Sequence, residues 1–266
     1  MIQVFSSPEL LADAVAQHIV TSAAEAISSR GRFTLALAGG STPRAAYSRL
    51  ATGDSRLAAG DWQLATGDWR LVHILWGDER CVPPDDSRSN YRMAKEALLD
   101  RVPVPADQIH RIRGEDEPEK AAAEYERELR ALLNDEQCPH PERSEGSRES
   151  HGPDLVLLGL GEDGHTASLF PGQAAVQETA RWVVAVPAPD ATMWRITLTP
   201  ALLNQARNVT FVVSGAKKAG RLQQVLQGPF APDILPAQAI RPAQGRLTWM
   251  VDQAAAGRLR PEISRT

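Results

Sequence analysis

The chain has 266 residues, of which 42% are hydrophobic and 23% charged, a composition typical of a globular protein with one large or two small domains. Its 29 basic and 33 acidic side chains give a net charge of −4 without any basic face or arm, so the sequence indicates no binding of nucleic acid. Two cysteines without nearby partners, no signal-peptide pattern and no apolar run of membrane-spanning length predict a cytoplasmic protein with reduced thiols and no membrane partner.

The first half of the chain alternates between helical and strand-like patterns. Ser7 and Pro8 are a typical helix start, apolar residues then recur every four positions, and Gly31 is expected to end this helix. An apolar run at 33–38 predicts a buried strand, and Pro43 is expected to open the next helix. The other elements predicted in this half are a strand at 71–76 and helices at 90–99 and 118–133.

The second half repeats the alternation. Strands alternating with helices predict an α/β fold with a mostly parallel, Rossmann-like sheet that helices flank on both faces. Functional groups of such folds gather at the carboxyl ends of the strands. We interpret residues 1–266 as a single domain of this class. The predicted elements are strands at 155–159, 181–186, 194–199, 209–214 and 247–251, a helix at 216–226 and a short C-terminal helix.

Two segments do not fit this alternation, and we interpret both as loop insertions. Residues 53–68 carry a seven-residue repeat whose units begin with a Gly-Asp pair, at Gly53, Gly60 and Gly67. A Gly-Asp pair in every unit disfavours a coiled coil, so a duplicated surface loop is the simpler interpretation. Residues 134–152 are polar and poor in apolar side chains, which predicts a mobile surface insertion.

The strand at 33–38 runs into two glycines, Ser41 and Thr42 before the next helix. Glycine lets the backbone approach a ligand closely, and a helix start offers unpaired N–H groups to a phosphate. Gly40, Ser41 and Thr42 are therefore candidate phosphate ligands, and a tight turn capped by Ser41 is the alternative. The segment is neither the dinucleotide fingerprint nor a P-loop, because the spaced glycines and the Gly-Lys-Ser/Thr ending are both missing.

Charged residues follow the strand at 71–76. Asp78, Glu79 and Arg80 lie where a strand passes into a loop, which is a common place for catalytic or binding side chains. An arginine such as Arg80 is able to bind a phosphate with two N–H groups at once. A surface cluster with an internal salt bridge is the alternative, and this segment taken alone favours it.

The best candidate for acid–base chemistry follows the strand at 155–159. His165 lies beside Asp163 in a glycine-rich loop, and a helix is expected to start at Thr166. An imidazole that titrates near pH ~6.5 is suited to a general base, and a carboxylate can orient its ring or stabilise its charged form. A surface or helix-capping histidine is the alternative. The glycines on both sides favour catalysis, because they serve little purpose in a plain turn.

Isolated basic residues in two other segments are weaker candidates. Lys217 and Lys218 lie where the strand at 209–214 passes into a helix, and Arg195 lies inside the strand at 194–199. Two solvated lysines explain the first pair more simply than an anion site. The sequence has no Gly-x-Ser-x-Gly motif after a strand and no histidines at metal-binding spacing, so we expect neither a serine nucleophile nor a metal ion.

Taken together, these segments resemble the 6-phosphogluconolactonase family, within the superfamily that also contains the glucosamine-6-phosphate isomerases. The resemblance covers nearly the whole chain, and it implies a fold similar to those of glucosamine-6-phosphate deaminase and ribose-5-phosphate isomerase. Each matching piece is short, but their order and spacing together are highly specific. The pieces are AGGSTP at 38–43, GDERCVP at 77–83, SNYRMAKEALL at 89–99, GLGEDGHTASLFPG at 159–172, RITLTPALLNQA at 195–206 and SGAKKA at 214–219.

The resemblance implies a hydrolase that opens 6-phospho-D-glucono-1,5-lactone to 6-phosphogluconate in the oxidative pentose phosphate pathway, without a cofactor. It implies that His165 is the general base that activates water and that Asp163 is its companion. The family's lysine follows Gly-x-x, which selects Lys218 over Lys217. The positions that correspond to its substrate and phosphate site are Gly40, Ser41, Thr42, Asp78, Arg80, Arg195 and Lys218.

Two other functions are weighed against the lactonase. A related isomerase/deaminase shares the Gly-Ser-Thr-Pro turn and the Asp-Gly-His, but it has Ile-Ala-Phe-Asn-Glu-Pro in place of TASLFPG at 166–172 and Asp-Glu-Tyr in place of DER at 78–80. Both differences favour the lactonase. A sugar-phosphate-sensing transcription regulator would need a DNA-binding module, for which the first 30 residues supply one amphipathic helix at most. We expect a monomer or a weak homo-oligomer.

Overall fold

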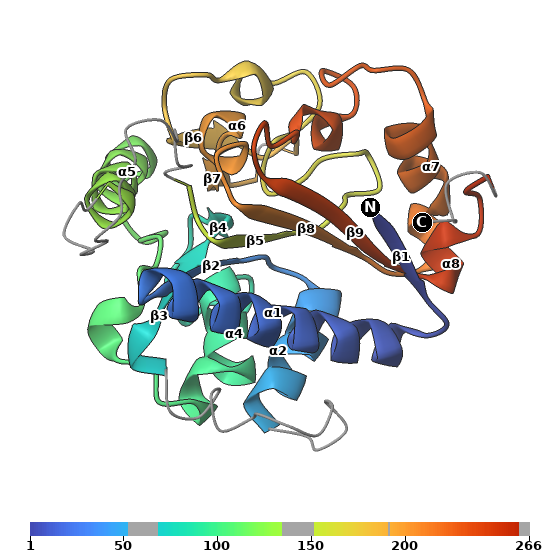
Figure 1. Cartoon of the computed structure of the whole chain (residues 1–266). Helices are drawn as coiled ribbons and strands as arrows, with labels where there is room; N and C mark the ends of the chain where they lie inside the picture. The colour runs from blue at the N-terminus through green and yellow to red at the C-terminus, as the bar shows by residue number, and fades with distance from the viewer. Residues whose placement is uncertain (53–68, 135–151, 191, 261–266) are drawn as a thin grey trace, which may run out of the picture.

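The computed structural model describes residues 1–52, 69–134, 152–190 and 192–260 (Figure 1). The interpretation of residues 53–68 as a duplicated loop lies outside the described part of the chain. The same is true of the insertion predicted at 134–152, apart from its first and last residues.

The described residues form a six-stranded sheet in which every neighbouring pair of strands is parallel. The central strands are buried along their whole length, as expected for a parallel sheet covered on both faces. The sequence patterns do not predict the first strand, which is short and partly exposed. In spatial order the strands are β1 (Ile2–Phe5), β9 (Arg246–Asp252), β8 (Asn208–Val213), β5 (Leu155–Leu158), β2 (Phe33–Leu37) and β3 (Val72–Trp76).

Helices flank this sheet, and the predicted α/β fold is confirmed. Figure 1 shows α1 (Pro8–Arg30), α2 (Ser41–Thr52) and α4 (Asn90–Ala97) below the sheet, with α6 (Pro200–Leu203) and α7 (Ala219–Gln227) above it. The described residues also form the α-helices α5 (Pro118–Leu133) and α8 (Gln253–Ala256). Short 3-10 helices are η1 (Trp69–Leu71), η2 (Leu99–Arg101), η3 (Ala106–Gln108), η4 (Ala174–Gln177), η5 (Ala216–Lys218) and η6 (Pro236–Ala239).

A second, three-stranded antiparallel sheet lies beside the main one. Its order is β4 (Asp78–Arg80), β7 (Trp194–Leu198) and β6 (Val183–Pro187), and α5 packs against it. The runs at 181–186 and 194–199 are therefore strands, as predicted, but they do not join the parallel sheet. The connection between them is too short for the crossover that a parallel pair requires, so they pair antiparallel.

The sequence determines the ends of α1 closely. The Ser7 hydroxyl accepts a hydrogen bond from the Leu10 N–H at 3.3 Å, and Pro8 occupies the first turn. Gly31 ends the helix with a φ of 73°, and its N–H donates to the Ile27 carbonyl at 2.8 Å. Glycine adopts this left-handed conformation without a steric penalty, which is why it ends so many helices. Both predicted ends of this helix are confirmed.

The start of α2 differs from the prediction. The helix begins at Ser41, two residues before the expected Pro43, because Gly40 takes a φ of 107° and its carbonyl accepts the Arg44 N–H at 3.1 Å. Gly40 therefore occupies the N-cap position. The N–H groups of Ser41 and Thr42 are consequently among the first-turn donors that a helix leaves without intrahelical partners.

The helix expected to start at Thr166 is absent, and this prediction is wrong. The Thr166 hydroxyl donates to the Gly159 carbonyl at 2.8 Å, and Thr166 forms an isolated bridge with Leu169 across a tight turn. A threonine that bonds to nearby backbone in this way stabilises a turn at the expense of a helix. The segment that carries His165 is therefore a compact loop.

Two buried tyrosines hold the strand ends from which the functional loops depart. The Tyr47 hydroxyl bonds to both the N–H and the carbonyl of Ala38, at 2.9 and 3.0 Å. The Tyr125 hydroxyl does the same for Trp76, at 2.9 and 3.1 Å. Burial raises the pKa of both phenols, so they remain neutral donors and acceptors. These bonds satisfy peptide groups that the strand pairing leaves unpaired.

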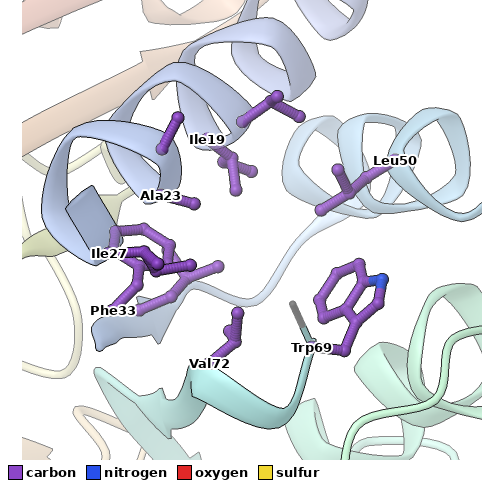
Figure 2. Close-up of a pocket in the computed structure, with 10 residues that line it drawn as sticks. Ile19, Ala23, Ile27, Phe33, Leu50, Trp69 and Val72 are labelled. Carbon is purple, nitrogen blue, oxygen red and sulfur yellow. The ribbon is translucent and has the colours of Figure 1, made fainter. Parts of the chain in front are cut away.

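A small apolar cavity separates α1 and α2 from β2 and β3 (Figure 2). Its volume is about 40 Å³. Its walls are apolar side chains, among them Ile19, Leu50, Trp69 and Val72, which point toward the same space in Figure 2. Empty apolar space of this kind weakens the packing of a core.

Candidate active site

A cleft of about 340 Å³ opens at the carboxyl ends of the central strands. The strand order of the main sheet reverses between β2 and β5, and ligands of open α/β sheets bind at such a switch point. The loops that follow β2, β3 and β5 all contribute to the cleft. Six residues predicted from the sequence line it, namely Gly40, Asp78, Arg80, His165, Arg195 and Lys218.

Three other predicted residues are not part of the cleft lining. Ser41 and Thr42 follow Gly40 in the first turn of α2, where Ser41 is exposed and Thr42 is half-buried. Asp163 lies behind His165 and contacts it directly. Of the two lysines considered, Lys218 lines the cleft and is half-buried, whereas Lys217 is exposed.

The loop after β5 folds His165 tightly over its own backbone. The His165 Nδ1 atom lies 2.6 Å from an Asp163 carboxylate oxygen, which also accepts the His165 backbone N–H at 3.1 Å. A Cβ atom at position 161 would come within 2.2 Å of Nδ1, so only Gly161 permits this arrangement. Gly164 completes the turn with a φ of 95°. Both of these glycines, which precede the histidine, thus have a geometric reason.

The Asp163 contact sets the polarity of the imidazole. Partial burial raises the pKa of Asp163, but the backbone N–H and the ring of His165 outweigh this effect, and the net pKa lies below its usual value. The carboxylate is therefore an acceptor for Nδ1–H. A neutral ring that donates from Nδ1 presents a lone pair on Nε2. The ring is one-third exposed, and its centroid lies 5.0 Å from that of the Phe170 ring, with the two rings tilted by 56°.

Arg80 and Arg195 form a pair of like charges on the opposite wall. They are direct partners across the antiparallel β4–β7 pair, a placement that destabilises a sheet. Burial and the charge of Arg80 lower the pKa of Arg195. Within the described part of the chain, both Nε atoms are buried without a hydrogen-bond partner. Such unsatisfied donors are expensive unless a ligand completes them, so this wall is suited to an anion.

Asp78 also lines the cleft, and sequence reasoning missed the residues that hold it. The Ser168 hydroxyl donates to one carboxylate oxygen at 2.6 Å, and the Asn90 amide donates to the other at 3.2 Å. Ser168 and Asn90 both line the cleft and are almost completely buried. Their positions in two matching motifs were visible in the sequence, but their contact with Asp78 was not.

Glu79, the middle residue of the same short strand, points away from the cleft and is buried. Its carboxylate accepts the backbone N–H groups of Asn90 and Tyr91, each at 2.7 Å, and thereby anchors the start of α4. Burial raises its pKa against the opposing effect of these hydrogen bonds. Because successive side chains of a strand point to opposite faces, Asp78 and Arg80 face the cleft and Glu79 points into the protein.

Across the described residues, no group of three or more His, Cys, Asp or Glu side chains is arranged to hold a metal ion. None of the helices in the described part of the chain is long and apolar enough to cross a lipid bilayer.

Comparison with known proteins places the chain in a family. Residues 6–249 match the family model described as glucosamine-6-phosphate isomerases/6-phosphogluconolactonase. The chain belongs to this family. It is 41% identical to the 6-phosphogluconolactonase of a Nostoc species over 243 residues, which cover 91% of this chain and 90% of that protein. The predicted family and enzyme class, a hydrolase of the lactonase type, are confirmed.

Solved structures agree with this assignment. The 6-phosphogluconolactonase of Trypanosoma brucei superposes with a TM-score of 0.78 at 31% identity and covers 98% of both chains. A monomeric glucosamine-6-phosphate deaminase superposes with a TM-score of 0.73 at 20% identity, over 97% of this chain and 99% of that one. The second likeness concerns the fold alone, and it confirms the similarity to the deaminase fold expected from the sequence.

Proposed function

We propose that the protein hydrolyses 6-phospho-D-glucono-1,5-lactone to 6-phosphogluconate, with His165 as the general base. The observation that carries this proposal is His165, which contacts Asp163 at 2.6 Å and lines the same cleft as the paired Arg80 and Arg195. A base and a dianion site in one cleft fit a substrate that has a phosphate at one end and an ester at the other. The relatives named above are 6-phosphogluconolactonases, which supports the same substrate.

The phosphate is held by cations and by the start of α2. Arg80 and Arg195 supply buried Nε donors without protein partners in the described residues, and Lys218 adds a third positive charge on the cleft. The N–H groups of Gly40, Ser41 and Thr42 at the helix start add a favourable dipole. Anchoring the phosphate converts a loose encounter into an oriented one, which brings the lactone carbonyl toward His165.

The reaction then needs a single proton carrier. Nε2 of His165 takes a proton from water as the water oxygen bonds to C1, and Asp163 stabilises the resulting imidazolium. The tetrahedral alkoxide collapses and breaks the bond between C1 and the ring oxygen. The imidazolium returns the proton to that oxygen, which leaves as the C5 hydroxyl. The product acid then loses its own proton to the solvent.

The proposal is tested by generating the lactone from glucose 6-phosphate in the assay and following proton release, with a no-enzyme blank because lactones open spontaneously. His165→Gln should lower kcat about 10²–10⁴-fold and leave KM within a few-fold, as expected for the loss of a general base. His18, which lies outside the cleft, provides the matched variant His18→Gln with unchanged kcat.

Two results would overturn this function in different ways. Full activity in His165→Gln would remove His165 from the role of base while keeping the lactonase. A wild-type rate no faster than the blank would remove the lactonase itself, and ammonia release from glucosamine 6-phosphate would be measured next. A cytoplasmic location, the absence of a cofactor and a monomeric or weakly associated state remain predictions.

A further inference from the structure

We infer that Ser168 and Asn90 are positioning residues that hold Asp78 as an acceptor for the ring hydroxyls of the sugar. This inference rests on the proposed function, because it assigns a hydroxyl-reading role to one wall of the same cleft. It concerns specificity and not the hydrolytic step, which belongs to His165. Neither Ser168 nor Asn90 was recognised as part of the site from the sequence.

Ser168 is fixed at both its backbone and its side chain. Its N–H donates to the Thr197 hydroxyl at 3.1 Å, and its own hydroxyl donates to Asp78 at 2.6 Å. Only 2% of Ser168 is exposed, so the hydroxyl has no freedom to rotate toward solvent. A short hydrogen bond from a buried neutral donor to a carboxylate selects one orientation of that carboxylate.

Asn90 fixes Asp78 from the other side. Its amide donates to the Asp78 carbonyl at 2.9 Å and to the second carboxylate oxygen at 3.2 Å. Glu79 holds the Asn90 backbone in turn, since it accepts the Asn90 N–H at 2.7 Å. A Cβ atom on Gly39 would lie 2.1 Å from the Asn90 amide oxygen, so Gly39 leaves the space in which this amide sits.

The hydrogen-bond acceptor positions that Asp78 has left face the cleft. An ionised carboxylate offers about four acceptor positions on its two oxygens, and Ser168 and Asn90 each occupy one. The other positions require donors, and sugar hydroxyls are donors of the right kind. Because the carboxylate is held on two sides, it accepts hydrogen bonds only from hydroxyls at fixed places on the sugar ring. A free carboxylate would adapt to many hydroxyl patterns.

The same loop connects this acceptor with the base. His165 and Ser168 lie three residues apart on the turn, and Ala167 between them takes a left-handed φ of 48°. Non-glycine residues adopt such a conformation rarely and at a cost, which the surrounding structure must impose. The turn places the imidazole and the Ser168 hydroxyl in one cleft. It thereby sets the distance between the attacked carbonyl and the hydroxyls that Asp78 reads.

A double-mutant cycle tests the inference. Ser168→Ala should raise KM for the lactone about 10-fold with kcat reduced less than threefold, and Asp78→Ala should raise KM further. Adding Ser168→Ala to Asp78→Ala should change KM by less than twofold, because Ser168 acts through Asp78. Independent, multiplying effects of the two changes on KM would overturn the inference, and so would a loss confined to kcat.

Controls separate positioning from stability and from the proposed function. Thr34→Val removes a similar hydroxyl–carboxylate bond of 2.8 Å, from Thr34 to Asp154, outside the cleft, and it should leave KM unchanged. If Ser168→Ala fails to fold, Asn90→Ala runs the same cycle. Calorimetric binding of 6-phosphogluconate repeats the cycle without turnover. An inactive wild type with coupled binding would therefore reject only the proposed reaction, whereas an active wild type with uncoupled variants would reject only this inference.

Discussion

Two aspartates lie at opposite ends of the strands of the main sheet, which we call the amino edge and the carboxyl edge. The hydrogen-bond partners of the two side chains differ. Asp154 precedes β5 at the amino edge and is buried. One of its oxygens accepts both the N–H and the hydroxyl of Thr34, at 2.9 and 2.8 Å, and the other accepts Arg30 at 2.9 Å. Asp78 at the carboxyl edge is half-buried and has only Ser168 and Asn90 as side-chain donors in the described residues.

These two aspartates show how one sheet produces both a structural carboxylate and one that is suited to binding. At the amino edge, the end of α1 brings Arg30 over the strands, and protein donors saturate Asp154. At the carboxyl edge, the chain leaves β2 and β5 in opposite directions along the sheet, and the cleft opens there. A carboxylate there keeps acceptor positions for a ligand. A carboxylate whose acceptor positions are filled by protein donors has a structural role. A carboxylate in a cleft that keeps free acceptor positions is suited to binding.

The largest expected effect separates these two roles directly. Asp154→Asn should lower the free energy of unfolding by about 2–4 kcal/mol, because the new amide presents a donor to Thr34 or Arg30, which are donors themselves. Lactone KM and kcat of the folded protein should not change. Asp78→Asn should do the reverse, with a stability change below about 1 kcal/mol and a large rise in KM. Chemical denaturation and the lactone assay measure both quantities.

An Asp154→Asn variant that unfolded no more easily than the wild type would contradict the structural role of Asp154. An Asp78→Asn variant that lost as much stability as Asp154→Asn would show that Asp78 also has a structural role. Asp107→Asn, near the surface and away from both edges, provides the control for a charge change alone.

Substitution of Arg195 tests whether the like charges of Arg80 and Arg195 lower the stability of the fold while they favour the binding of an anion. Arg195→Met removes the repulsion with Arg80, so the free energy of unfolding should rise by about 0.5–1 kcal/mol. KM for the lactone should rise about 10–100-fold, the usual cost of losing hydrogen bonds to a charged group. Inorganic phosphate should raise the Tm of the wild type more than that of the variant.

Arg246→Met is the matched change at an exposed arginine at the start of β9, outside the cleft. It should alter neither KM nor the response to phosphate. A destabilised Arg195→Met would show that Arg195 contributes to the fold, and the interpretation of this wall as an anion site would lose its main support.

The elements that sequence reasoning predicted well are those whose signals are local. The ends of α1 follow from Ser7, Pro8 and Gly31, each of which acts within one helical turn. The Asp163–His165 pair was also visible, because its members are two residues apart and the contact needs only a glycine-rich turn. Such features depend on neighbouring residues, so the sequence contains all of the information that they require.

The features that were missed depend on distant residues. Ser168 and Asp78 are 90 positions apart, and they meet only because β4 pairs Asp78 with Thr197 on β7, whose hydroxyl accepts the Ser168 N–H. The pairing of Arg80 with Arg195 depends on the register of two short antiparallel strands, which their composition does not specify. The helix expected at Thr166 failed because a side-chain bond to Gly159 stabilises a turn instead.

A histidine pair at the outer edge of the sheet, away from the cleft, provides a smaller test. His73 on β3 contacts His110 at 3.0 Å, and burial, His110 and Arg32 lower the pKa of His73 to about 4. An unfolded histidine titrates near pH ~6.5, so between these values the unfolded chain binds a proton that the folded chain does not. Stability should therefore fall as the pH drops through this window.

Between pH 7 and pH 5 the expected loss from His73 is about 1 kcal/mol, after allowing for the solvent that reaches the half-buried ring. Denaturation at the two pH values measures it. The loss should be smaller by this amount in His73→Gln, which cannot titrate. An identical pH response in both proteins would show that His73 is not the group responsible. The effect on KM at pH 7 should be negligible, because His73 does not line the cleft.

The smallest effect is expected at the apolar cavity between the helices α1 and α2 and the strands β2 and β3. Val72→Ile adds one methylene to a side chain that points into this space of about 40 Å³ (Figure 2). It keeps the β-branched shape that suits a strand, so the free energy of unfolding should rise by about 0.5–1 kcal/mol with unchanged kcat and KM. Val209→Ile, inside the fully packed β8, is the matched change and should destabilise through crowding. Equal effects at the two positions would mean that the cavity is not available for filling. Opposite signs would confirm that the apolar space beside β2 is a packing defect, in contrast to the polar cleft at the carboxyl ends of the strands.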